Sequence, residues 1–217
     1  MSRTPVVILL SGRGSNLQAI IDQTTAGRLA IDIRAVISNR AEAEGLTLAR
    51  AVGIPTQVID PRDYADGDRF DAALMQAIDT HAPRLVILAG FMRILGADFI
   101  QHYVMRLINI HPSLLPAFKG LKTHARAMEA KVKQHGASVH FVTPDVDGGP
   151  IIIQSALTVH PGDTVESLAQ RVLLEEHRIY PLAIQWFIAG RLSLDNGNVL
   201  LDGQRRPEQG LQPMALA

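Results

Sequence analysis

The stretch "VVILLSGRGSNLQAII", Val6 to Ile21, decides the fold of this chain. Its first five residues, Val6 to Leu10, are all apolar and predict a strand buried on both faces, as in a parallel sheet. Two glycines follow, and then Leu17, Ile20 and Ile21 recur at the spacing of one helix face. A buried strand that passes through glycines directly into a helix is typical of the first unit of a doubly wound α/β sheet.

The same alternation continues along the first half of the chain. Further buried strands are predicted at Ile31 to Ser38, Ile54 to Ile59, Leu85 to Gly90 and Arg106 to Ile110. Asp68 to His81 has the period of an amphipathic helix. This order predicts a doubly wound, mostly parallel, Rossmann-like sheet with right-handed crossovers.

The second half has a different pattern. "ASVHFV" and "PIIIQSALTV" flank the turn-rich "TPDVDGG" and predict a partly antiparallel extension of the sheet. A long helix is expected from Thr164, its N-cap, to Ala189, with Gly190 as the stop. "LSLDNGNVLL" predicts a hairpin around its Asn-Gly turn. We expect one domain over residues 1–217, with a flexible tail over about 204–217.

Composition narrows the classes of function. Lys+Arg and Asp+Glu both total 21, so no net charge favours nucleic acid or a membrane surface as a partner. The chain has no cysteine, which excludes disulfides and thiolate zinc sites and fits a cytoplasmic location. Its eight histidines are scattered without a metal-ligand spacing, so we expect no metal. No apolar run reaches the roughly 18 residues of a spanning helix, and we expect a soluble protein.

The glycine loop "SGRGSNL" has two interpretations. It is not a dinucleotide fingerprint, because Leu17 replaces the third glycine and the second strand ends in "SNR" without an acidic residue. It suits a phosphate monoester, with Gly14 allowing close approach and Ser15 and Asn16 adding polar groups at a helix N-terminus. The alternative is that the glycines only turn the chain and Ser15 caps the helix.

A second polar group is expected at the carboxyl edge of the sheet. Asn109 and His111 in "LINIHPSLLP" are two residues apart, so both side chains point the same way from an extended chain. An amide donor beside an imidazole suits acyl transfer, with Asn109 facing an oxyanion and His111 moving a proton. Asp147, in "DVDGGPII", would raise the pKa of His111 if it lay nearby. Strand-end polarity and an ordinary Asp-Gly turn remain the alternatives.

Several segments taken in order carry a family resemblance. They are "ISNR", "LAGFMRIL", "NIHPSLLP", "GLKTH", "GASVHFVTPDVDGGPII" and "EEHRIYPLAI". Together they closely resemble the folate-dependent formyltransferases over roughly Val6 to Pro207, and "LLSGRGSNLQAII" directs the resemblance to the branch that formylates glycinamide ribonucleotide in purine synthesis. This implies transfer of formyl from the co-substrate 10-formyltetrahydrofolate to a primary amine by direct attack, giving formylglycinamide ribonucleotide and tetrahydrofolate, without metal.

The resemblance also implies roles for individual residues. Asn109 stabilises the tetrahedral oxyanion, His111 donates or shuttles the proton, and Asp147 holds His111 and raises its pKa. The ribonucleotide phosphate is assigned to Gly14, Ser15 and Asn16, and the rest of that substrate to Leu173, Leu174, Glu175 and Glu176. The folate pocket is assigned to Met92, Arg93, Ile94, Leu95, Asn109, Thr143, Pro144, Asp145, Val146 and Asp147.

The chain departs from the family pattern at one place. A family arginine on the folate side falls at Gly67, where neighbouring Arg62 or Arg69 could replace it. The expected partners are the two small-molecule substrates, and the expected assembly is a monomer or homodimer. The alternatives are a formyltetrahydrofolate deformylase, in which water replaces the amine and the phosphate loop has no use, and a non-catalytic folate- or nucleotide-binding module. A tRNA formyltransferase would need a further domain and a basic surface.

Overall fold

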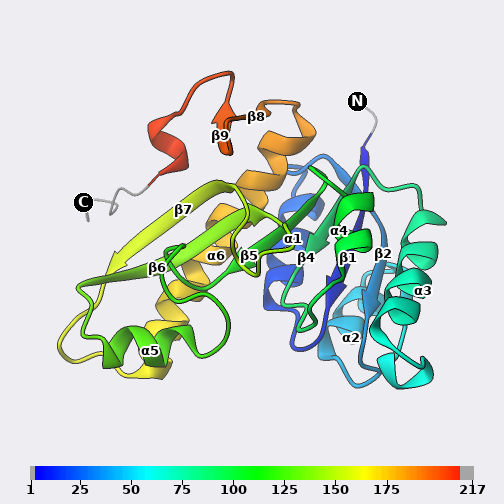
Figure 1. The fold of residues 1–217 in the computed structure, drawn as a ribbon, viewed down its shortest axis with the longest axis horizontal. Coiled ribbons are helices and arrows are strands. Elements are labelled where there is room, and N and C mark those ends of the chain that lie inside the picture. The colour runs from blue at the N-terminus through cyan, green and yellow to red at the C-terminus, as the bar shows by residue number, and fades with distance from the viewer. Residues whose placement is uncertain (1–2, 211–217) are drawn as a thin grey trace. The chain divides into compact units, whose positions relative to one another are not determined.

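The computed structural model describes residues 3–210 of the chain (Figure 1). The chain divides into two compact units. The first runs to Asn109 and takes in Val142–Pro144; the second comprises Ile110–Phe141 and the residues from Asp145 onward. The single domain expected from the sequence stays a prediction, and each unit is described by itself.

The elements alternate as predicted. The strands are β1 (Thr4–Leu10), β2 (Ile31–Ser38), β3 (Thr56–Val58), β4 (Leu85–Leu88), β5 (Leu107–His111), β6 (Gln134–Phe141), β7 (Ile151–Thr158), β8 (Leu192–Asp195) and β9 (Asn198–Leu201). The helices are α1 (Ser15–Thr25), α2 (Glu44–Ala51), α3 (Gly67–Asp79), α4 (Ala97–His102), α5 (Thr123–Glu129) and α6 (Val165–Ile188), with 3-10 turns η1 (Pro61–Asp63) and η2 (Pro207–Gln209).

The hydrogen-bonded strand order is β3-β2-β1-β4-β5-β6-β7. β1 pairs in parallel with both β2 and β4, β2 with β3, and β4 with β5, whereas β6 and β7 are antiparallel. The chain order therefore reverses between β1 and β4, which is the switch point of a doubly wound sheet. The predicted fold class is confirmed: a mostly parallel sheet with a partly antiparallel extension and a long C-terminal helix.

In the first unit, the continuous hydrophobicity of β1 has a structural reason. Val7 and Leu9 belong to the apolar cluster formed with α3 and α4. Leu10 reaches the opposite layer, where its side chain lies against Gly45 of α2. All five residues Val6 to Leu10 are fully buried, so both faces of β1 are covered, as a parallel sheet requires.

The second unit is built on the antiparallel pair β6–β7 and on α6, which packs against both strands. Thr164 caps α6 by accepting from the Ser167 N–H, and the Ser167 hydroxyl accepts from the Thr164 N–H in return. Gly190 follows the helix with φ of 69°. The hairpin β8–β9 turns at Asn196 and Gly197, both with positive φ. The predicted helix and hairpin are confirmed.

Three features differ from the sequence prediction. Helices α2 and α4 are additional; α2 contains Gly45, a poor helix former, but a side chain there would collide with Leu10. Residues 204–210, expected in a tail, include η2, where buried Gln209 donates to the carbonyls of Ile152 and Val199. The rest of the expected tail, 211–217, lies outside the described residues. Among the helices of residues 3–210, none has the length and apolar character needed to cross a membrane.

Candidate active site

The glycine loop connects β1 to α1 in the first unit. Gly14 is the N-cap of α1, with φ of 80°, and no side chain caps this helix. A Cβ on Gly14 would lie 2.7 Å from the Cα of Gly45. Ser15 is the first residue of the helix rather than its cap, so the capping alternative for Ser15 is wrong. Close packing against Gly45 therefore favours a glycine at position 14. The N-terminus of α1 keeps the partial positive charge that attracts an anion.

Ser11 fixes this loop at the switch point of the sheet. Its hydroxyl donates to the side-chain oxygen of Asn39, at the end of β2, over 2.5 Å, and accepts from the Met92 N–H at 2.8 Å. Its own N–H donates to the Gly90 carbonyl at 3.0 Å. One small buried side chain therefore ties together the chain after β1, β2 and β4. Sequence reasoning missed Ser11, although a serine directly after a buried strand was the available signal.

Asn109 and His111 are the third and fifth residues of β5. The alternation of a strand directs both side chains to one face, as predicted. His111 is 6% exposed, while Asn109 is half-buried and has other contacts of its own. The spacing that the sequence predicts is therefore realised on a single strand.

Within the second unit, Asp147 meets His111. The Nδ1 atom of His111 lies 3.3 Å from Oδ2 of Asp147, and its Nε2–H donates to the Phe118 carbonyl at 3.0 Å. The Gly120 N–H donates to the same Oδ2 at 2.8 Å. Asp147 has φ of 50°, an unusual conformation for a non-glycine residue and one that clusters at functional sites. The predicted proximity of the two side chains is therefore present, although they are 36 positions apart in sequence.

Burial and neighbouring groups act in opposite directions on the pKa values of His111 and Asp147. Burial lowers the pKa of His111 below its ordinary value, and the Phe118 carbonyl and the charge of Asp147 oppose that effect without cancelling it. Asp147 thus raises the pKa of His111, as expected, but the net shift is downward because desolvation outweighs the carboxylate. Burial alone would raise the pKa of Asp147, but contacts with His140, the Gly120 N–H and His111 hold it below its usual value.

His140 is a second imidazole at this carboxylate that sequence reasoning placed among the scattered histidines. Its Nε2 lies 3.6 Å from Oδ1 of Asp147, and its Nδ1–H donates to the Phe141 carbonyl at 2.9 Å. Its place at the end of β6, seven residues before Asp147, was the available signal. Between residues 3 and 210, no group of three or more His, Asp or Glu side chains is arranged to hold a metal ion.

The loop "TPDVDG" forms a tight turn before β7. The Gly148 N–H donates to the Asp145 carbonyl at 2.9 Å, and a Cβ on Gly148 would collide with the Asp145 carboxylate. That carboxylate binds Lys119 at 2.8 Å, while Val146 is 46% exposed. Thr143, which has further contacts, and Pro144 belong to the first unit. The turn therefore presents Val146 outward and Asp147 inward.

The segment Met92 to Leu95 follows β4 in the first unit. Met92 and Ile94 are 64% and 80% exposed, whereas Leu95 is buried in the apolar cluster. The guanidinium of Arg93 stacks over the Phe70 ring at 4.7 Å. Two apolar side chains of this short loop are therefore exposed at the surface.

Gly67 lies apart from these contacts, as the first residue of α3 after its N-cap Asp66. A Cβ there would meet nothing within 4 Å. Of the two arginines considered as replacements, Arg62 is bound to Asp60 and Arg69 lies 3.8 Å from Asp66. The replacement of the family arginine by Arg62 or Arg69 therefore stays a prediction.

The helix segment Leu173 to Glu176 divides between faces of α6. Glu176 is 8% exposed and Leu174 is 68% exposed, on the opposite side of the helix. Glu175 accepts from the Ser155 hydroxyl at 2.5 Å and from Arg178 at 2.8 Å. Of the four assigned residues, Glu175 thus has a role in joining α6 to β7, and Glu176 is the buried carboxyl.

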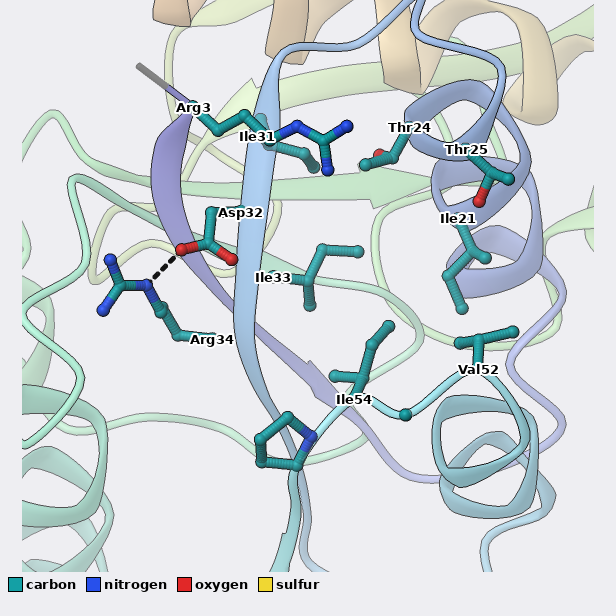
Figure 2. Close-up of a pocket in the computed structure, with 12 residues that line it drawn as sticks. Arg3, Ile21, Thr24, Thr25, Ile31, Asp32, Ile33, Arg34, Val52 and Ile54 are labelled. Atoms are coloured by element: carbon teal, nitrogen blue, oxygen red, sulfur yellow. Dashed lines mark hydrogen bonds and ion pairs between the residues drawn. The ribbon is translucent and has the colours of Figure 1, made fainter.

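A pocket of about 380 Å³ lies elsewhere in the first unit (Figure 2). It is lined by the first residues of β2, with Ile31 and Ile33 on its floor and the ion pair of Asp32 and Arg34 beside them. These are the amino ends of the strands, opposite the edge where β1 enters the glycine loop. None of the assigned site residues lines this pocket, so it is not the candidate active site.

Comparisons with known proteins show the family to which this chain belongs. The model of the formyl transferase family matches residues 4–184. The chain is 49% identical to phosphoribosylglycinamide formyltransferase of Escherichia coli (strain K12) over 205 residues, which are 94% of this chain and 97% of that protein. A solved phosphoribosylglycinamide formyltransferase from Coxiella burnetii has a TM-score of 0.92 and 50% identity, covering 96% of this chain and 98% of that one.

A formyltetrahydrofolate deformylase from Pseudomonas putida KT2440 is also similar in structure. Its TM-score is 0.82 at 31% identity, and the match covers 92% of this chain but 70% of that one. The deformylase is thus a more distant neighbour than the two phosphoribosylglycinamide formyltransferases.

Proposed function

Because this chain belongs to the formyl transferase family, we propose that it transfers the formyl group of 10-formyltetrahydrofolate to the primary amine of glycinamide ribonucleotide. The products are formylglycinamide ribonucleotide and tetrahydrofolate, in de novo purine synthesis. The observation that carries this proposal is the buried pair of His111 and Asp147, with Nδ1 3.3 Å from Oδ2, on the strand that also presents Asn109.

The chemistry follows from what these three side chains can do. The amine attacks the formyl carbon, and the carbonyl oxygen becomes an oxyanion, to which the Asn109 amide donates a hydrogen bond. The amine nitrogen must lose a proton, and the folate nitrogen must gain one before the carbon–nitrogen bond to folate breaks. His111 takes up the first proton and supplies the second, and the charge of Asp147 stabilises the imidazolium that exists in between.

The lowered pKa of His111 suits this sequence of steps. An imidazole that is neutral near pH 7 is ready to accept the proton of the attacking amine. The carboxylate of Asp147, whose pKa is itself held low, stays charged and limits the cost of the buried cation. The network therefore favours an acceptor at rest and an acid once the intermediate has formed.

The phosphate of the ribonucleotide is proposed to bind at Gly14, Ser15 and Asn16. The uncapped N-terminus of α1 supports this, because backbone N–H groups there suit an anion. The loop also separates the two enzyme classes among the structural relatives. A deformylase uses water as the acceptor and has no acceptor phosphate to hold, so the loop favours the transferase.

One assay tests the proposal. The purified protein should convert 10-formyltetrahydrofolate to tetrahydrofolate when glycinamide ribonucleotide is present, without added metal and with full rate in the presence of a chelator. Water alone as the acceptor and initiator tRNA serve as the comparison acceptors. Folate turnover of equal rate without the ribonucleotide would reject the transferase and favour a deformylase.

A further inference from the structure

The Asp147 carboxylate is approached on both of its oxygens by imidazoles of the second unit. His111 faces Oδ2 through Nδ1, and His140 faces Oδ1 through Nε2 at 3.6 Å. Both rings are deeply buried, His140 with 2% and His111 with 6% of its surface exposed. Burial lowers the pKa of His111, and the neighbouring protein groups add to that effect or oppose it.

The backbone fixes where each ring carries its first proton. A carbonyl only accepts, so the Phe118 carbonyl places a hydrogen on Nε2 of His111, and the Phe141 carbonyl places one on Nδ1 of His140. The next proton taken up by either ring must then go to the nitrogen that faces Asp147. One carboxylate charge therefore stands opposite both sites of protonation, and it cannot fully compensate two imidazolium ions.

We propose that His140 is a positioning residue for the formyl transfer: it competes with His111 for the single charge of Asp147 and keeps His111 neutral until the amine delivers its proton. This inference rests on the proposed function for its consequence, but the coupling of the two rings is a property of the protein alone. The positive charge of His140 is among the causes that lower the pKa of His111.

Other charged or titratable groups lie near His111 and His140, and their effects must be distinguished from the effect of His140 on His111. Arg126, from α5, acts on His111 in the same direction as His140. Asp145, the other carboxylate of the turn, is bound to Lys119. His135 on β6 and His124 on α5 hydrogen-bond to each other at 3.1 Å. Strand β7 places Ile151 opposite His140, and α6, which packs on β6, carries the buried Glu176.

The test is a titration of the His111 ring by NMR in the whole protein without substrate, its signal assigned with His111→Gln. In His140→Gln, an amide of similar reach replaces the imidazole, and the His111 midpoint should rise by roughly 0.5 pH unit or more. Ser138→Ala is the matched control on β6, since this buried serine contacts Ser113, Leu115 and Gln154 and not Asp147. It should leave the midpoint in place.

An unmoved His111 midpoint in folded His140→Gln would overturn the proposal. If His140→Gln does not fold, His140→Asn replaces it, with the same expected direction. The acidic limb of kcat/KM should shift with the NMR midpoint, whereas a purely structural role would lower the rate without moving the limb.

The two proposals fail in different ways. A parent protein that shows no formyl transfer would reject the proposed function and still allow the titration to be read. If the parent is active and the His111 midpoint is unchanged in His140→Gln, the proposed function stands and the proposed role of His140 is rejected.

Discussion

At the scale of single residues, the proposed site depends on three side chains whose chemistry is separable. In the proposed mechanism the amide of Asn109 donates, the imidazole of His111 moves a proton, and the carboxylate of Asp147 supplies charge. His111 and Asp147 lie within 3.3 Å of each other, and each of the three proposed roles can be removed by a substitution that changes few atoms.

Asn109→Ala removes the proposed oxyanion donor. We expect kcat to fall by a factor on the order of 10² to 10³, as for other donors of this kind, with the fold retained. Steady-state kinetics with both substrates measure the loss. Asn198→Ala, at the exposed first residue of β9, is the matched control and should keep the parent rate. A rate within a few-fold of the parent in Asn109→Ala would rule out the oxyanion role.

Asp147→Asn keeps the volume of the side chain and removes its charge. Asp147 acts to raise the pKa of His111 against the opposing effect of burial, so its neutralisation should lower that pKa further. The acidic limb of the kcat/KM profile should then move to lower pH while the maximum rate falls. A profile that keeps its position would leave Asp147 as a turn residue whose conformation alone matters.

At the scale of elements, the glycine at position 14 is required where the N-terminus of α1 packs closely against α2. Gly14→Ala would combine a φ of 80°, which costs a residue with a side chain about 1–2 kcal/mol, with a clash against the backbone of Gly45. We expect a lower free energy of unfolding and a raised KM for glycinamide ribonucleotide. Urea unfolding and steady-state kinetics report the two effects.

Gly12→Ala is the matched control for the stability effect of Gly14→Ala. A Cβ at Gly12 meets nothing within 4 Å, so its unfolding free energy should change by about 0.5 kcal/mol at most. Equal destabilisation by both variants would show that the close packing on Gly45 is not what requires a glycine at position 14.

At the scale of the whole molecule, buried histidines couple folding to pH. Burial lowers the pKa of His111 and His124, and it lowers the pKa of His135 to about 4. The unfolded chain then binds more protons than the folded one below the unfolded histidine pKa of about 6.5. Their stabilisation is complete above that pH and is lost as the pH falls toward 4.

We therefore expect the free energy of unfolding to decrease steadily from pH 7 to pH 4.5. His135 alone accounts for about 2–3 kcal/mol of that change, given its near-complete burial. Urea unfolding at a series of pH values measures the slope. His135→Gln should flatten it, and a slope identical to that of the parent would contradict the assignment to His135.

The pattern of the sequence was sufficient for the α/β alternation, because burial on both faces leaves a continuous apolar run and a helix leaves a 3.6-residue period. It also marked Asn109 and His111 as a pair, because residues that are two apart on a strand point to the same face of the sheet. Helix α2 was not predicted, because Gly45 is a poor helix former that is kept for the packing of its backbone.

The sequence by itself thus determined the class of fold and marked the glycine loop, Asn109, His111 and Asp147 through spacing and residue type, whereas the other candidate residues came from the resemblance to a family. Only the tertiary structure decided that Asp147 meets His111, that His140 takes the other oxygen of the same carboxylate, and that Ser11 joins three strand ends. It also decided the direction of the pKa of His111, where burial exceeds the effect of the carboxylate. Contacts across many residues and the loss of water are set by packing, which no local pattern records.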